Sequence, residues 1–287
     1  MTNSPTINYD LHTHSYFSDG AYSPKELLSA AVDCNITHLA LTDHDTVGGL
    51  EEAQQAAREL DINFIPGIEL SCVWKHQLLH LVGLNIDASN SSLLAGVAQN
   101  QERRWQRAEA IHRDLAKHDI EVRENVELSL QKGSVPTRPH FAAALVKQGH
   151  AKDKKQAFKR YLVKGKPGYV AMQWPELSEA ANWINEAGGV AVLAHPMRYK
   201  FTRSRLIMLI EEMQEYKVNA IEVATPITDK QQMQMLAQLS LEHQLWASRG
   251  SDFHSVEQVW ARLGGAPELP EDVRPVWQLF KDKESLC

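Results

Sequence analysis

The residues best suited to chemistry are histidines and acidic residues at short spacings. One residue separates His12 from His14, and Asp19 follows five positions later. In an extended segment, residues two apart point to the same side, so both imidazoles can reach one metal ion. Taken alone, such a pair is more often two surface histidines. The interpretation therefore depends on what the rest of the chain supplies.

Six further segments with strand character each contain, or run into, a residue that can bind a metal ion. These residues are His44, Glu69, His80, His195, Glu222 and the pair Asp252 and His254. A lone histidine in an apolar strand is usually a hydrogen-bonded core residue. Seven coincidences at the same end of seven strands are better explained by a shared site, because the strand ends of a barrel converge on one mouth.

Seven short, mostly apolar segments are predicted as strands, which is typical of strands covered on both faces. They are Ile7–Leu11, His38–Thr42, Asn63–Ile68, Leu78–Leu84, Gly189–Leu193, Ala220–Val223 and Leu245–Ser248. Helices are predicted at Leu27–Cys34, Leu50–Leu60, Ser178–Ala187, Arg203–Tyr216 and Lys230–His243. Ser23, Pro24 and Glu26 form the capping pattern that opens the first helix. This alternation predicts an α/β protein whose seven βα units form a barrel in preference to an open sheet.

The alternation stops between residues 96 and 175, where helices are predicted without strands. These helices are Val97–Lys117, Pro139–Gln148 and Lys154–Val163. We therefore expect a barrel made of residues 1–95 and 176–287, and a helical insertion domain made of residues 96–175. Residues 98–172 hold sixteen Lys or Arg against eight Asp or Glu, while the whole chain has a net charge of −6. Solvated helix faces could account for this excess, but its segregation favours an anionic partner and a role in substrate selection.

As an ordered set, the motifs resemble the PHP family, named for polymerase and histidinol phosphatase. The matching motifs are His12-x-His14 with Ser18-Asp19-Gly20, Thr42-Asp43-His44-Asp45, Gly67-x-Glu69, His80, Ala194-His195-Pro196 and Ser251-Asp252-Phe253-His254. The resemblance implies a distorted (β/α)7 barrel with three divalent metal ions. It implies one ion held by His12, His14, Glu69 and Asp252, a second by Glu69, His80 and His195, and a third by Asp19, His44 and His254.

A closer similarity, to the bacterial TrpH/YciV branch of this family (RNase AM), extends through the insertion. It rests on Trp74, Val82–Asp87, Gln101–Arg104, Thr137-Arg138 with His140-Phe141, Lys164–Lys166 with Gly168–Val170, and Leu245–Ser248 followed by Gly250–His254. The branch implies hydrolysis of the 3′-phosphate of nucleoside 3′,5′-bisphosphates and degradation of short 5′-phosphorylated RNA in the 5′ to 3′ direction. One departure is Met197-Arg198, where the branch commonly has glycine after the His-Pro pair, and we expect it to alter the shape of the loop.

The donor set contains imidazole and carboxylate without thiolate, which suits Mn²⁺ above all, with Fe²⁺ and Zn²⁺ as alternatives. We expect a hydroxide bridging the two ions that share Glu69 to attack phosphorus. His195 and Asp19 are candidates for assisting the departure of the ribose 3′-oxygen. Asp10, Asp43 and Asp45 are predicted to orient the histidines.

A second phosphate on the substrate requires cationic donors, and arginine offers a bidentate one. The candidates are Arg138, His140, Arg198 and Lys164, with Arg103, Arg104 and Lys166 as further possibilities. For each of them a solvated surface position is the competing interpretation. Trp105, Phe141, Phe158 and Tyr161 could stack a base, although core packing is favoured for them.

Two alternative functions remain open from the residues. One is a phosphatase of a small metabolite such as histidinol phosphate, which the basic insertion disfavours because that substrate carries an amine. The other is a non-catalytic, metal-binding accessory module, which the complete ligand set disfavours. The chain has no apolar run long enough to cross a bilayer and no signal-peptide pattern at its beginning. Together with three separated cysteines (Cys34 and Cys72 as predicted core thiols, and Cys287), these features predict a cytoplasmic protein with no evident obligate protein partner.

Overall fold

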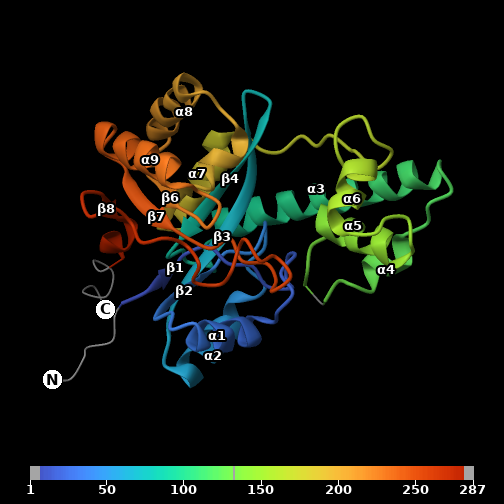
Figure 1. The fold of residues 1–287 in the computed structure, drawn as a ribbon, viewed down its shortest axis with the longest axis horizontal. Coiled ribbons are helices and arrows are strands. Elements are labelled where there is room, and N and C mark those ends of the chain that lie inside the picture. Colours follow the sequence, from blue (N-terminus) through green and yellow to red (C-terminus); the bar gives the residue numbers. More distant parts are fainter. Residues whose placement is uncertain (1–6, 132, 281–287) are drawn as a thin grey trace.

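The computed structural model describes residues 7–131 and 133–280, which contain a curled sheet of eight strands in sequence order (Figure 1). Neighbouring strands are parallel except around the fourth, which runs antiparallel to both of its neighbours. The α/β class is therefore confirmed, with one more strand than expected. The strands are β1 (Tyr9–Asp10), β2 (His38–Leu41), β3 (Asn63–Trp74), β4 (Gln77–Leu84), β5 (Val190–Leu193), β6 (Ala220–Ala224), β7 (Trp246–Arg249) and β8 (Arg274–Pro275).

Five helices accompany the sheet, α1 and α2 beside one part of it and α8 and α9 beside another (Figure 1). They are α1 (Pro24–Asp33), α2 (Leu50–Leu60), α7 (Leu177–Glu186), α8 (Arg203–Glu215) and α9 (Lys230–Glu242), with short 3₁₀ turns at Pro196–Tyr199 and Val276–Leu279. The predicted capping box of α1 is confirmed, because Ser23 Oγ accepts from the Glu26 amide at 3.1 Å and the Glu26 carboxylate accepts from the Ser23 amide at 2.8 Å.

The expectation of seven βα units is wrong at the third strand, where β3 and β4 form a hairpin. β3 continues to Trp74, six residues beyond its expected end, and Ser71 pairs with His80 in the antiparallel register. Glu69 and His80 consequently lie inside long strands and not at strand ends. The turn consists of Lys75 and His76, with φ of 46° and 65°. Sequences usually mark such a turn with Asn or Gly, and this one does not.

The segments that follow β1 and β7 meet directly, although these two strands lie far apart in the sheet order. The amide of Leu11 donates to the Arg249 carbonyl at 3.1 Å, and the amide of Asp252 donates to the His12 carbonyl at 2.8 Å. Gly250 permits this approach, because an added Cβ would lie 2.4 Å from His12 Cβ. The first and last metal-binding motifs of the chain are thus neighbours in space.

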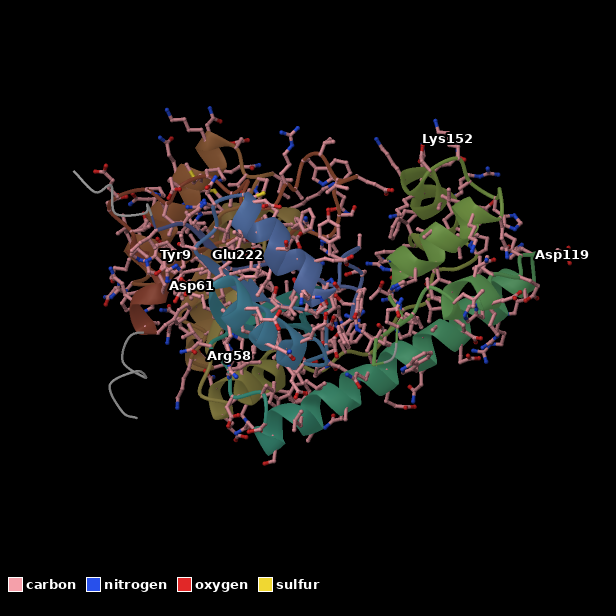
Figure 2. All side chains as sticks on the ribbon, turned by 90° about the horizontal axis from the view of Figure 1, so that it is seen from below. Tyr9, Arg58, Asp61, Asp119, Lys152 and Glu222 are labelled. Carbon is pink, nitrogen blue, oxygen red and sulfur yellow. The ribbon has the colours of Figure 1, made fainter. Side chains whose placement is uncertain are left out.

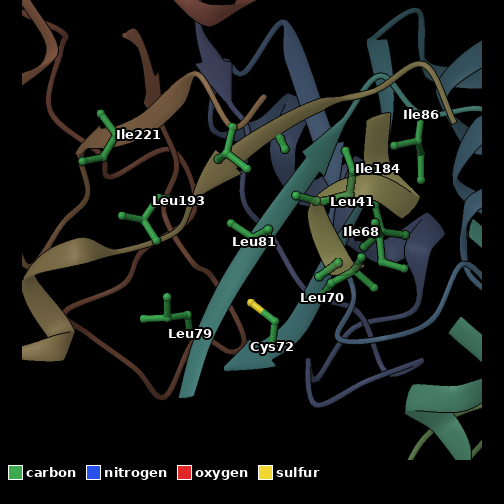
Figure 3. Packing of buried hydrophobic residues seen from close by; sticks show 14 of the residues in the cluster. Leu41, Ile68, Leu70, Cys72, Leu79, Leu81, Ile86, Ile184, Leu193 and Ile221 are labelled. Atoms are coloured by element: carbon green, nitrogen blue, oxygen red, sulfur yellow. The ribbon is translucent and has the colours of Figure 1, made fainter. Parts of the chain in front are cut away.

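Fully buried aliphatic side chains of the strands, among them Leu41, Ile68, Leu81 and Leu193, pack against buried residues of the surrounding helices in the main hydrophobic core (Figure 3). Cys72 belongs to this core, as predicted. The same prediction is wrong for Cys34, which is exposed because it follows the last turn of α1 on the outer surface. Cys287 and residues 1–6 lie outside the described residues.

The basic segment has its own hydrophobic cluster, which includes Ile111, Leu115, Phe141 and Leu145. Its helices are α3 (Ser91–Ala116), α4 (Arg123–Glu127), α5 (Arg138–Lys147) and α6 (Lys154–Ala157), followed by the π-helical turn η1 (Phe158–Leu162). Figure 2 shows α3 passing from the barrel to the part that carries Asp119 and Lys152. The expected boundary between residues 95 and 96 falls inside this continuous helix, so the division into two domains stays a prediction.

The first turns of α3 belong with the barrel in their packing. A Cβ added at Gly96 would lie 2.2 Å from the Trp183 ring on α7, so the two helices cross closely at this glycine. No helix within residues 7–131 and 133–280 is long and apolar enough to span a membrane.

Candidate metal centre

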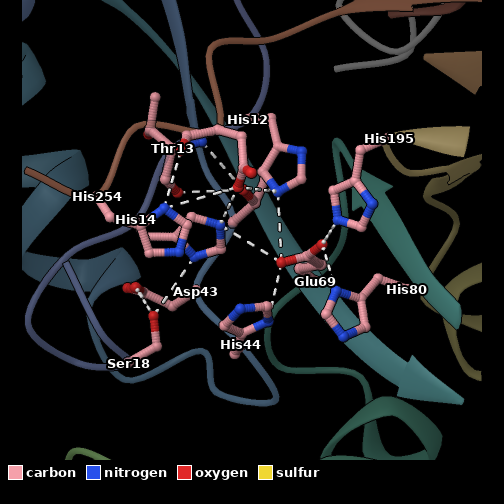
Figure 4. A network of polar contacts seen from close by, with 12 residues as sticks. His12, Thr13, His14, Ser18, Asp43, His44, Glu69, His80, His195 and His254 are labelled. Atoms are coloured by element: carbon pink, nitrogen blue, oxygen red, sulfur yellow. Dashed lines mark hydrogen bonds and ion pairs between the residues drawn. The ribbon is translucent and has the colours of Figure 1, made fainter. Parts of the chain in front are cut away.

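The carboxylate of Glu69 is the centre of a cluster of histidines (Figure 4). Glu69 is completely buried and reaches the cluster from the middle of β3. Its two oxygens face different groups of imidazoles. Oε1 lies 2.9 Å from His80 Nδ1 and 3.0 Å from His195 Nε2, and Oε2 lies 2.8 Å from His44 Nδ1, 3.3 Å from His12 Nε2 and 3.4 Å from His14 Nε2. One carboxylate therefore joins two neighbouring ligand groups.

Asp252 completes the group formed by His12, His14 and Glu69. Its Oδ1 lies 3.5 Å from His12 Nε2 and 3.2 Å from His14 Nε2. Ligands that each lie about 2.1 Å from one ion are about 3.0–3.5 Å apart. Within the described part of the chain, the buried atoms His12 Nε2, His14 Nε2 and Glu69 Oε2 have no hydrogen-bond partner. Converging, unsatisfied donor atoms at these separations fit a shared metal ion.

A third group surrounds Asp19, on the side of the cluster that opens to the cavity described below. Asp19 Oδ1 lies 3.3 Å from His254 Nε2 and 3.9 Å from His44 Nε2. The rings of His14 and His254 stack at 4.1 Å, and ligand atoms of His14, Asp19, His44 and His254 all lie within 4.8 Å of one another. All nine predicted ligands thus lie in one cluster, and their assignment to particular ions stays a prediction.

Two central ligand residues, His14 and Glu69, have pKa values that favour the protonation states that metal binding needs. Burial lowers the pKa of His14 to about 3, helped by the neighbouring His254. Burial alone would raise the pKa of Glu69, but the charges of His44, His80 and His12 outweigh it and hold that pKa well below its usual range. The Glu69 carboxylate therefore stays ionised next to a neutral His14.

Glu222 is a functional residue that the predicted ligand set left out. From β6, its Oε1 accepts from His12 Nδ1 at 2.7 Å and its Oε2 accepts from the backbone amide of His195 at 2.5 Å. It orients one ligand ring and the backbone of another ligand residue. The available signal was its position at a strand end, and its partners lie 210 and 27 residues away in the sequence.

The three aspartates predicted to orient histidines differ in their contacts. Asp43 accepts from Ser18 Oγ at 2.7 Å, and that hydroxyl lies 3.4 Å from His14 Nδ1, so Asp43 acts on the ring through a serine. Burial raises the pKa of Asp43 to about 6. The side chain of Asp10 instead accepts from the amides of Ser251 and Gly264, each at 2.8 Å, and so fixes the loop after β7.

Asp45 binds the insertion helix instead of a histidine. Its Oδ2 accepts from Arg104 Nε at 2.7 Å, and its Oδ1 accepts from Asn100 Nδ2 at 2.7 Å and from the Ser71 amide at 2.8 Å. Arg104, a further candidate for phosphate binding, is 7 % exposed and occupied by this ion pair. Asp45 therefore holds α3 against β3.

A cavity of about 360 Å³ opens between the cluster and the insertion. Asp19, His44, His80 and His254 line it from the barrel, together with four arginines: Arg104, Arg107, Arg138 and Arg198. Among the predicted phosphate contacts, Arg138 and Arg198 therefore face the cavity. His140 lies outside its lining, with Nδ1 accepting from the Thr137 amide at 3.1 Å, and Lys164 is exposed in a loop.

Arg107 was not predicted, and its environment is unusual. Burial and the neighbouring charges of Arg138 and Arg104 lower its pKa to about 9. Within the described residues, its buried Nε has no hydrogen-bond partner. Like charges packed together in this way are stabilised by a bound anion. The sequence signal was its place one helical turn after Arg104, which is weak because exposed helix faces often repeat arginine.

Comparison with known proteins identifies the family. The family model described as "PHP domain" matches residues 10–190, which is more than half of the chain. The chain belongs to the PHP domain family. It is 40 % identical to the 5′-3′ exoribonuclease Rnm of Escherichia coli K12, over 97 % of this chain and 96 % of that protein. It is 39 % identical to the 3′,5′-nucleoside bisphosphate phosphatase of Chromobacterium violaceum, over 94 % and 95 % of the two chains.

A solved structure has the same architecture as this PHP chain. It is an amidohydrolase from Chromobacterium violaceum with bound sulfate and no metal, and it matches with a TM-score of 0.90 and 38 % identity over 96 % of this chain and 97 % of that one. The resemblance drawn from the motifs, including its extension through the insertion, is thus confirmed over nearly the whole PHP chain. The Met197-Arg198 departure lies in the turn Pro196–Tyr199, where Arg198 Nη2 contacts Asp252 Oδ2.

Proposed function

We propose that the chain is a metal-dependent phosphoesterase that removes the 3′-phosphate from nucleoside 3′,5′-bisphosphates and degrades short 5′-phosphorylated RNA from its 5′ end. The observation that carries the proposal is the composition of the cavity, in which a cluster of imidazoles and carboxylates and four arginines share one lining. A substrate with two phosphates could place one at the ligand cluster and the other at the arginines. The names of the Escherichia coli and Chromobacterium violaceum relatives support this substrate class.

The ligand cluster is suited to three divalent ions, with Mn²⁺ preferred and Fe²⁺ or Zn²⁺ as alternatives. His12, His14, Glu69 and Asp252 would hold one ion, Glu69, His80 and His195 a second, and Asp19, His44 and His254 a third. The unsatisfied buried atoms of His12, His14, Glu69 and Asp19 support this assignment. When bound, such ions lower the pKa of a bound water to about 7 and offset the charge of a phosphate under attack.

The arginines of the cavity would hold the phosphate that is not hydrolysed. Arg107 and Arg138 lie together without a carboxylate partner among their described hydrogen bonds and ion pairs, and each has a pKa lowered by burial and by neighbouring arginines. An anion between them removes this repulsion, and an arginine can form two parallel hydrogen bonds to a phosphate. Arg198 is partly engaged by Asp252 and would contact the phosphate closest to the cluster.

Hydrolysis adds the oxygen of water to phosphorus and breaks the bond to the ribose 3′-oxygen, which must gain a proton. Glu69 contacts histidines of both ligand groups and would thereby fix their positions around the phosphate that is hydrolysed. His195 and Asp19 are the candidates for assisting the departure of the ribose 3′-oxygen. His195 Nδ1 is buried without a hydrogen-bond partner within the described residues and could carry the proton. The charges of His254 and His44 outweigh the burial of Asp19 and hold its pKa well below its usual range, so Asp19 would assist as a carboxylate and not as a proton donor. The enzyme is proposed to act in the cytoplasm, where a reducing environment suits the buried free thiol of Cys72.

The two alternatives fit this cavity less well. A small metabolite with an amine, such as histidinol phosphate, would bring a cation next to four arginines. A non-catalytic accessory module would not require four arginines in the cavity beside its metal ligands. Neither alternative is favoured by a contact of its own.

The proposal is tested by phosphate release from adenosine 3′,5′-bisphosphate in the presence of Mn²⁺. Turnover is expected for the wild-type protein and for His118→Ala, which changes an exposed histidine of the insertion. Turnover is expected to be lost in His12→Ala. A 5′-phosphorylated oligoribonucleotide is expected to shorten from its 5′ end in the same preparations. Cleavage of histidinol phosphate by a protein that leaves both nucleotide substrates intact would refute the proposal.

A further inference from the structure

A compact loop after β7 exposes a large aromatic side chain. Two successive turns form this loop, since the amide of Gln258 donates to the Ser255 carbonyl at 3.1 Å and the amide of Ala261 donates to the Gln258 carbonyl at 2.9 Å. Ala261 is 1 % exposed and anchors the loop, whereas the preceding Trp260 is 58 % exposed. Val256 and Val259, at the corners of the same turns, are 68 % and 64 % exposed. Grouped apolar exposure of this kind marks binding surfaces.

The loop is held at the cavity and not free in solvent. Trp260 and Gln258 line the cavity together with Asp19 and His254 of the cluster and with the insertion residues Arg138 and Phe158. Glu257 Oε2 lies 3.4 Å from Lys154 Nζ of α6, so an ion pair joins the loop to the insertion. In Figure 1 the chain after β7 extends from the barrel toward the insertion. The loop that carries the indole is therefore attached to the barrel through buried Ala261 and to the insertion through the ion pair of Glu257.

The cavity has three aromatic walls, and they are not equivalent. The Trp174 ring already has the guanidinium of Arg104 over it at 5.3 Å, and the Phe158 ring has that of Arg138 at 5.9 Å. Within residues 7–131 and 133–280, Trp260 has no ring or cation contact of this kind. Its face is consequently the aromatic surface of the cavity that remains available to a ligand.

We infer that Trp260 is the stacking platform for the nucleobase of the substrate. The inference rests on the proposed function. The metal ligands and the arginines would bind the two phosphates, and Trp260 would bind the nucleobase. A base is flat and mainly apolar on its faces, and stacking on an aromatic side chain tolerates all four bases. An exposed indole at the rim thus suits an enzyme that accepts successive nucleotides of different identity. Gln258 lines the same cavity, and its side-chain carboxamide has both a donor and an acceptor for the polar edges of a base.

The test compares substrates with and without a base. Trp260→Ala is expected to lower kcat/KM for adenosine 3′,5′-bisphosphate by about 5- to 150-fold, mainly through KM, because one base–aromatic stack is lost. The same variant is expected to hydrolyse the abasic tetrahydrofuran 3′,5′-bisphosphate at the wild-type rate. Trp260→Phe, which keeps an aromatic face, is expected to restore most of the affinity. Trp105→Ala is the matched control, since Trp105 is 43 % exposed on α3 and lies outside the cavity lining.

Three results would overturn the inference. An equal loss on the nucleotide and the abasic substrate would mean that Trp260 supports the loop or excludes water. An unchanged kcat/KM on both would mean that the indole does not contact the substrate. A wild-type protein inactive on both would reject the proposed function, and the platform with it, whereas the first two results leave the proposed function intact.

Discussion

Two ligand positions of the cluster lie on strained backbone. His195 has a φ of 30° and Asp252 a φ of 53°, in the left-handed region that costs a residue other than glycine about 1–3 kcal/mol. Each strained amide has a specific acceptor, since His195 N donates to Glu222 and Asp252 N donates to the His12 carbonyl. Glu222 therefore fixes both a ligand ring and a strained peptide. The geometry of two ligand groups depends on Glu222 as well as on Glu69.

Replacing Glu222 with glutamine tests this dependence. The amide group retains one oxygen, so it can accept from His12 Nδ1 or from the His195 amide, but it turns an NH₂ group toward the other donor. The affinity for Mn²⁺ is expected to fall by about 10- to 100-fold, with the far-ultraviolet circular dichroism unchanged. Calorimetric titration of the two proteins measures the effect. Glu211→Gln, at an exposed position on α8, is the control, and equal Mn²⁺ affinity for Glu222→Gln and wild type would contradict the role of Glu222.

Among the elements, α3 has the largest influence on the site. It is a single helix of 26 residues, about 39 Å long, that begins in the barrel and ends in the insertion. Its contacts with the barrel include the close approach of Gly96 to Trp183 and the ion pair of Asp45 with Arg104. Arg107 follows Arg104 by one turn on the same face. The positions of Arg104 and Arg107 in the cavity therefore depend on a carboxylate of the barrel.

A double-mutant cycle on this ion pair tests how firmly α3 is held. Asp45→Ala leaves the Arg104 guanidinium buried without its counter-charge and is expected to lower the free energy of unfolding by about 3–5 kcal/mol. Asp45→Ala combined with Arg104→Met buries no unpaired charge and is expected to regain part of that loss. Urea denaturation followed by circular dichroism gives both values. If the double variant is as unstable as Asp45→Ala alone, the cost does not arise from the unpaired arginine.

For the whole molecule, the sequence predicts best what is encoded locally. The nine predicted metal ligands could be proposed because each stands in a short motif at a strand, and the structure brings their nine side chains together. The β3–β4 hairpin could not be found, because Lys75 and His76 occupy turn positions without the residues that normally mark them. Arg107 was missed, and Glu222 was named as able to bind a metal ion but not as an orienting residue. The roles of both depend on partners that only tertiary structure supplies, such as Arg138 beside Arg107 and His12 beside Glu222.

The assembled cluster also predicts a pH dependence of metal binding. Burial opposes the charge of His254, but Asp19 and Asp252 outweigh it and raise its pKa to about 9. Below that pH the imidazole carries a proton that a metal ion must displace. The affinity for Mn²⁺ is therefore expected to rise between pH 6 and 9 by about tenfold per pH unit for each displaced proton.

Competition with a chelator of known affinity at each pH measures this slope. His254→Asn, whose side chain does not titrate, is expected to bind Mn²⁺ more weakly and with a shallower slope. An affinity for Mn²⁺ that is constant from pH 6 to 9 would contradict the raised pKa of His254.

The meeting of the segments after β1 and β7 has a consequence for how the protein is made. The His12 carbonyl accepts from the Asp252 amide and the His12 ring donates to the Glu222 carboxylate, and both partners are translated more than 200 residues later. Contacts this distant in sequence form late, because a long loop must close before they are made. The catalytic cluster cannot be complete while the ribosome is still adding residues up to His254. The site of the proposed function therefore forms only after nearly the whole chain has been synthesised.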